Sequence, residues 1–136
     1  MGPSVADVSS SSTILMVEDE HSLRDPVSKM LRRKGFTVFE ATDGEEAASL
    51  FRNKASVIDV VLLDLTLPRL SGGEVLRELR QLQPDVTVII TSAFSREQAQ
   101  TTIGAQPTWL YIRKPYRVDE LTDLVRDSIR AKKASG

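Results

Sequence analysis

The sequence contains no cysteine, one histidine, and aromatic residues at 5 % of the chain. Without cysteine, disulfide bonds, thiolate metal sites and cysteine nucleophiles are excluded. The 18 basic and 19 acidic residues leave a net charge of −1, so the basic excess typical of nucleic-acid-binding domains is missing. No apolar run reaches the roughly 20 residues of a membrane span, and residues 1–12 lack the pattern of a secretory signal. We therefore expect a soluble, cytoplasmic protein that binds neither nucleic acid nor membrane.

The length of 136 residues and the hydrophobic content of 40 % suit one domain with one core. Residues 1–12 are rich in serine and predict a flexible N-terminal tail. We place the folded domain at residues 13–131 and a C-terminal tail at residues 132–136.

Short β-rich segments alternate with segments of helical periodicity along the folded part. The pattern predicts strands at residues 13–17, 36–41, 58–64, 86–92 and 108–112, and helices at 22–35, 43–53, 72–83, 95–104 and 117–131. Such alternation predicts an α/β fold, a doubly wound five-stranded parallel sheet with right-handed crossovers. The third and fourth strands are apolar on both faces, as the centre of a parallel sheet requires.

Polar residues stand at the C-terminal ends of four of these predicted strands. They are Glu18 and Asp19, then Asp64, then Thr91 and Ser92, and finally Lys114 and Pro115. Taken singly, each has an ordinary explanation as a helix cap, a turn residue or a solvated charge. In a parallel sheet, however, all four strand ends lie at one edge, where ligands bind in open α/β folds. Their joint placement therefore indicates a site.

The composition of this group favours phosphoryl chemistry on a metal. Clustered carboxylates without histidine or cysteine suit a hard cation with oxygen ligands, Mg²⁺ in particular. A carboxylate beside such a cation can attack phosphorus, while an ammonium group and a hydroxyl bind the phosphoryl oxygens. A metal and Lys114 would also offset the charge of Asp64, which ends an apolar run where an isolated carboxylate is costly.

The segments ILMVEDE, VVLLDLTLPRLSG, VIITSA and YIRKPY, in this order, resemble the motifs of the receiver domain of two-component response regulators. The resemblance covers about residues 13–130. It implies a flavodoxin-like (βα)5 receiver fold and a role in a phosphorelay. A sensor histidine kinase or histidine phosphotransfer domain would pass a phosphoryl group from phosphohistidine to an aspartate of this chain, with Mg²⁺ present, and an output face would then switch.

By this resemblance Asp64 is the phosphoacceptor and Lys114 the lysine that pairs with the phosphate. The implied protein ligands of Mg²⁺ are Asp19, Asp64 and the backbone carbonyl of Thr66, and Glu18 would act on the metal through water. The resemblance also implies autocatalysed phosphorylation and dephosphorylation.

The hydroxyl implied by the family lies 22 residues before the lysine, which selects Ser92 rather than Thr91. Tyr111 matches the aromatic switch residue of the family; the less favoured alternative is that it is only a half-buried aromatic of its strand. In the family, the peptide bond before the residue that matches Pro115 is cis.

Several alternatives stay open at this stage. A Mg²⁺-dependent hydrolase with an aspartyl nucleophile would place a second acid two residues after it, where this chain has Thr66. A degenerate receiver would serve only as a docking module, which the full set of acids, hydroxyl and lysine argues against. The chain is either a stand-alone regulator or a receiver from a hybrid sensor kinase. Its output partner is unidentified, a phosphorylation-linked dimer is compatible with the resemblance, and the long QPTW loop leaves the output face undefined.

Overall fold

A parallel five-stranded sheet organises the chain. The computed structural model describes residues 12–67, 70–104, 106 and 109–135. Its strands are β1 (Thr13–Val17), β2 (Thr37–Ala41), β3 (Val60–Asp64), β4 (Thr87–Ser92) and β5 (Leu110–Arg113). Its helices are α2 (His21–Arg33), α3 (Gly44–Lys54), α4 (Gly72–Leu82), α5 (Arg96–Ile103) and α6 (Val118–Ser135). The strand order is β2-β1-β3-β4-β5, and every pairing is parallel.

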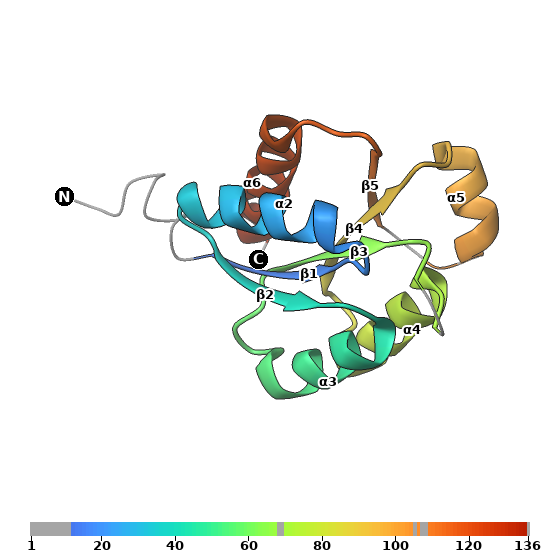
Figure 1. The fold of residues 1–136 in the computed structure, drawn as a ribbon. Coiled ribbons are helices and arrows are strands. Elements are labelled where there is room, and N and C mark those ends of the chain that lie inside the picture. The colour runs from blue at the N-terminus through green and yellow to red at the C-terminus, as the bar shows by residue number, and fades with distance from the viewer. Residues whose placement is uncertain (1–11, 68–69, 105, 107–108, 136) are drawn as a thin grey trace.

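Helices cover both faces of the sheet, which confirms the predicted doubly wound fold. Helices α2 and α6 lie on one face, and α3, α4 and α5 lie on the other (Figure 1). Because successive side chains of a strand point to opposite faces, Val61 and Leu63 enter one core cluster while Val60 and Leu62 enter the second. The central strand β3 is buried along its whole length.

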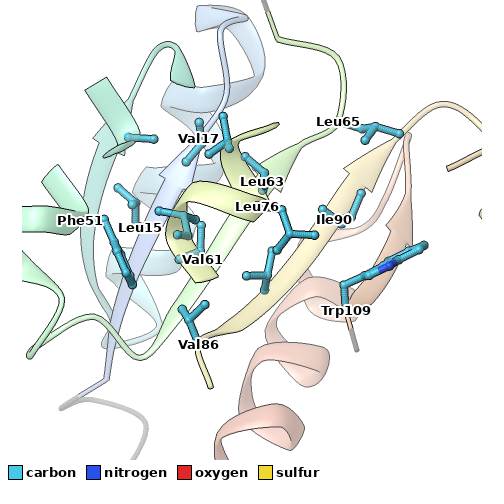
Figure 2. Packing of buried hydrophobic residues seen from close by; sticks show 14 of the residues in the cluster. Leu15, Val17, Phe51, Val61, Leu63, Leu65, Leu76, Val86, Ile90 and Trp109 are labelled. Carbon is cyan, nitrogen blue, oxygen red and sulfur yellow. The ribbon is translucent and has the colours of Figure 1, made fainter. Parts of the chain in front are cut away.

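The larger core cluster lies between the sheet and helices α3, α4 and α5. Figure 2 shows Phe51 at one side of this cluster and Trp109 at the other. Trp109 is 6 % exposed, and the Arg96 guanidinium lies 4.8 Å from the centre of its ring. Trp109 therefore packs the β5 end of the core.

Side-chain caps and one glycine fix the helices that surround the sheet edge. Asp43 accepts a hydrogen bond from the Glu46 amide at 2.8 Å and so caps the start of α3. Helix α4 begins with a capping box between Ser71 and Glu74. At Gly72 an added Cβ would lie 2.6 Å from the Leu65 Cα, so only glycine allows α4 to begin against the turn that follows β3.

Most observed boundaries lie within two residues of the predicted ones. Strand β5 begins at Leu110 instead of residue 108, and Thr108, like residues 1–11 of the predicted N-terminal tail, lies outside the described residues. Helix α6 continues to Ser135, past its predicted end at residue 131. Lys132, which was expected in a tail, extends from this helix to the Asp85 carbonyl at 3.0 Å. Among the helices that the structure describes, none combines the length and apolarity that a bilayer crossing needs.

Candidate functional site

The sheet register brings the predicted polar residues to one edge. Val17 pairs with Leu63, and Asp64 pairs with Thr91. Glu18 follows β1 directly, so it lies next to Asp64 across the strand pair. The Lys114 amide donates to the Ser92 carbonyl at 2.7 Å, which places the start of the loop after β5 beside the end of β4. The structure thus brings together Glu18, Asp64, Ser92 and Lys114, as the sequence predicted.

Three carboxylates form a cluster at this edge. One oxygen from each of Glu18, Asp19 and Asp64 lies within 4.8 Å of the others. Glu18 and Asp64 are buried, at 2 % and 4 % exposure, whereas Asp19 is exposed. The Thr66 amide donates to Asp64 Oδ1 at 3.0 Å and holds this carboxylate over the following turn. An all-oxygen donor set with one solvent-facing side fits Mg²⁺, which retains several waters when protein carboxylates bind it.

Lys114 lies between the two buried carboxylates. Its Nζ is 2.8 Å from Glu18 Oε1 and 3.3 Å from Asp64 Oδ2. The second oxygen of Glu18 accepts the Glu20 amide at 3.2 Å. Both oxygens of Glu18 therefore have protein partners in this structure, which the resemblance did not anticipate. Its water-mediated role toward a metal stays a prediction.

Burial and charge at the site disfavour ionisation of Asp64. Desolvation, followed by the neighbouring charge of Glu18, raises the pKa of Asp64 to about 7, while Lys114 and the Thr66 amide oppose the shift. Burial lowers the pKa of Lys114, but the hydrogen bond to Glu18 and the charge of Asp64 outweigh it, so the net direction is upward. Burial, followed by the charges of Glu18 and Asp64, raises the pKa of Tyr116 to about 12. The site therefore carries more negative charge than Lys114 compensates.

Both predicted switch residues bind the backbone of Phe94. The Ser92 side chain is buried, and its Oγ accepts the Phe94 amide at 3.0 Å. The Tyr111 hydroxyl donates to the Phe94 carbonyl. The half-buried Tyr111 ring meets Trp109 edge-on, with ring centres 6.4 Å apart. The bond between Lys114 and Pro115 is cis, which confirms that implication of the resemblance.

Two features of the site were missed by sequence reasoning. Arg24, in the first turn of α2, donates to the carbonyls of Glu18 and Asp19 at 2.9 and 3.4 Å. Its signal in the sequence is weak, because an arginine six residues after Glu18 on an amphipathic helix usually faces solvent. The second feature is the role of the Phe94 backbone, which no side-chain pattern can reveal.

Comparisons of the sequence with known proteins agree on one family. The family model described as "Response regulator receiver domain" matches residues 14–126. "Sensor kinase CckA" of Brucella abortus (strain 2308) is 31 % identical over 123 residues, which are 90 % of this chain and 13 % of CckA. "Sensory transduction protein RegX3" of Mycobacterium tuberculosis (strain ATCC 25618 / H37Rv) is 38 % identical over 121 residues, which are 87 % of this chain and 51 % of RegX3. The chain thus spans about half, or much less, of the length of these curated relatives.

Solved structures show the same likeness. A response regulator receiver domain protein from Clostridium thermocellum has a TM-score of 0.82 at 28 % identity, covering 92 % of this chain and 99 % of that one. A chain of the CheX–CheY–BeF3–Mg²⁺ complex from Borrelia burgdorferi has a TM-score of 0.75 at 28 % identity, covering 85 % of this chain and 87 % of that one. The chain therefore belongs to the family of response regulator receiver domains, whose general function is to accept phosphoryl groups in two-component signalling.

Proposed function

We propose that Asp64 is the phosphoacceptor of this receiver and that Lys114 and Ser92 assist the transfer. The observation that carries the proposal is the buried Asp64 carboxylate at 3.3 Å from the Lys114 ammonium, beside two further acids. The Thr66 amide holds this carboxylate in place, and the neighbouring Asp19 of the cluster is exposed to solvent.

In the proposed reaction an oxygen of Asp64 attacks the phosphorus of a phosphohistidine on the partner. The P–N bond breaks, its electron pair stays on the imidazole nitrogen, and Asp64 becomes an acyl phosphate. Lys114 stabilises the negative charge that spreads over the phosphoryl oxygens, and the Ser92 hydroxyl donates to one of them. Attack of water on the phosphorus of the acyl phosphate breaks its bond to the Asp64 oxygen, releases inorganic phosphate and returns Asp64 to its starting form.

The cation that fits this site is Mg²⁺, held by Asp19, Asp64 and the Thr66 carbonyl, with Glu18 acting through water. When bound, Mg²⁺ supplies positive charge that offsets the anionic oxygens of the carboxylates and the phosphoryl group. The excess negative charge of the site and its oxygen-only donors support this assignment. The Borrelia burgdorferi complex, which includes a receiver of similar fold, contains both BeF3 and Mg²⁺.

The proposed partner is a sensor histidine kinase or a histidine phosphotransfer domain, and the proposed setting is the cytoplasm. The domain that performs the function is residues 13–131, which include the residues matched by the family model. Its phosphorylation changes the face formed by α5 and β5, through Ser92 and Tyr111, for an output partner or a second receiver.

The experiment that tests the proposal is phosphorylation by acetyl phosphate. With Mg²⁺, intact-protein mass spectrometry should show one added phosphoryl group, labile to hydroxylamine as an acyl phosphate is. Asp64→Asn should abolish the addition. Asp43→Asn is the matched control, because it makes the same chemical change at a helix cap, where asparagine caps as well as aspartate.

Labelling of Asp64→Asn at the wild-type level would contradict the proposal. So would a stable label on exposed His21 or on Ser92 in the wild-type protein, located by peptide mapping.

A further inference from the structure

Arg24 connects the acidic turn after β1 to the end of β2. Its Nη1 donates to the Glu18 carbonyl at 2.9 Å and to the Asp19 carbonyl at 3.4 Å. Its Nε lies 3.4 Å from Glu40 Oε1, and its side chain is 15 % exposed. One planar guanidinium thus spans the turn and the neighbouring strand, which a fork of fixed donors can do and a lysine cannot.

Strand β2 also binds the acidic turn through a backbone hydrogen bond. The Glu18 amide donates to the Ala41 carbonyl at 3.0 Å, next to Glu40 in the chain. Glu40 is itself fixed by a second cation, because Arg32 Nη2 lies 3.2 Å from its Oε2. The amide of Glu18 is therefore bonded directly to β2, and its carbonyl is bonded to β2 through Arg24.

The charge of Arg24 alone would work against a cation at this site. A guanidinium bonded to the carbonyls of two cluster residues repels a divalent cation, and so lowers its affinity. The hydrogen bonds act in the opposite direction, because fixed backbone carbonyls fix the direction in which the Glu18 and Asp19 side chains leave the turn. Groups that orient metal ligands commonly raise affinity by about 10- to 100-fold.

We propose that Arg24 is a positioning residue that presets the acidic turn for a divalent cation. The inference rests on the proposed function, since it names a determinant of cation binding at the same site. It predicts the direction in which Mg²⁺ affinity changes when Arg24 is neutralised, and this direction distinguishes positioning from charge. If Arg24 acted by charge alone, its neutralisation would tighten binding, whereas loss of positioning weakens it.

The test is Mg²⁺ titration of the whole chain, followed by amide chemical shifts in NMR spectra. Arg24→Gln should raise the Mg²⁺ dissociation constant roughly tenfold, although it removes a repelling charge. Arg24→Lys keeps the repelling charge and loses the fork, so its constant should rise at least as much as that of Arg24→Gln. The matched control is Arg32→Gln, because Arg32 also binds Glu40 but bonds Val38 instead of the acidic turn. It should stay within about twofold of the wild type.

A second measurement needs no metal. Amide hydrogen exchange at Glu18 and Glu20 in metal-free protein should accelerate in Arg24→Gln and not in Arg32→Gln, at an unchanged melting temperature. This readout also separates the two proposals: wild-type protein that fails to bind Mg²⁺ refutes the metal assignment, while the exchange rates still test the positioning role. Tighter or unchanged Mg²⁺ binding by both Arg24 variants, or unchanged exchange in Arg24→Gln, would overturn the inference.

Discussion

Ser92 and Tyr111 are joined through the backbone of Phe94. The Ser92 Oγ accepts the Phe94 amide at 3.0 Å, and the Tyr111 hydroxyl donates to the Phe94 carbonyl. In the proposed switch, movement of the Ser92 hydroxyl toward a phosphoryl group weakens its bond to the Phe94 amide. Because the carbonyl of Phe94 accepts the Tyr111 hydroxyl, we expect a displacement of this backbone to be transmitted to the ring on β5.

The first prediction concerns this connection. Beryllofluoride with Mg²⁺, as a mimic of the phosphoryl group, should shift the backbone resonances of residues 92–96 and 109–112. Ser92→Ala should reduce these shifts strongly, because it removes the hydroxyl whose contacts differ between the free and the beryllofluoride-bound protein. Ser92→Thr, which retains a hydroxyl, should restore them. Equal shifts in Ser92→Ala, or crystal structures with and without beryllofluoride that keep Tyr111 in one rotamer, would exclude the switch and leave the phosphoacceptor assignment intact.

The second prediction concerns the metal. Asp19→Asn should weaken Mg²⁺ binding by at least about tenfold, because it removes the exposed carboxylate of a cluster that offers few protein ligands. Calorimetry or NMR titration measures the effect. Glu20→Gln is the control, since it removes a charge one residue away that does not belong to the cluster. Equal losses of Mg²⁺ affinity in the two variants would mean that Asp19 acts only through its negative charge and not as a ligand.

The third prediction is a pH dependence of stability in metal-free protein. The pKa of Asp64 is about 7 in the folded chain, above its ordinary value of 3.8. The folded state therefore binds the proton more tightly, so its stability falls as the pH rises from about 4 through 7. The difference between these two pKa values corresponds to at most about 4 kcal/mol. Asp64→Asn should remove this loss and raise the free energy of unfolding at pH 8 far more than at pH 4.5.

Urea denaturation at both pH values, with a chelator present, measures this difference. Asp19→Asn makes the same change at an exposed carboxylate and should show little of the effect. If Asp64→Asn raises the free energy of unfolding equally at both pH values, packing rather than the buried charge is responsible.

The fourth prediction compares two adjacent glycines at the start of α4. An added Cβ at Gly72 would lie 2.6 Å from the Leu65 Cα, whereas at Gly73 the nearest atom is the Ile103 Cα at 3.5 Å, an ordinary contact. Gly72→Ala should destabilise the protein by about 1–3 kcal/mol through overpacking against backbone. Gly73→Ala should be neutral or stabilising by up to about 1 kcal/mol. Thermal unfolding of the two variants measures the difference in stability. Similar changes in stability in both variants would contradict the close approach of Gly72 to the Leu65 backbone.

The sequence predicted the sheet well because the strands are short apolar runs and the helices carry clear periodicity. It predicted that Asp64 and Lys114 meet, because both lie at the C-terminal ends of strands of one parallel sheet and so at one edge. The pairing of Lys114 with Glu18 could not be predicted, since the reach of a glutamate across the site depends on packing in three dimensions. The length of α6 was underestimated because its last turn is held by a distant residue, Asp85.

Gly72 allows helix α4 to pack directly against the backbone that follows strand β3. Because α4 begins in direct contact with the Leu65 backbone, and the Gly72 amide bonds to the Leu65 carbonyl at 3.0 Å, this helix is locked to the strand that carries Asp64. We therefore expect that a change at the proposed phosphoacceptor is not absorbed by tilting of α4. We expect it to reach the β5 end of the sheet instead, where α5 is a short helix and β5 is an edge strand with one neighbour. In that case α4 would stay with β3 while α5 and β5 move relative to them.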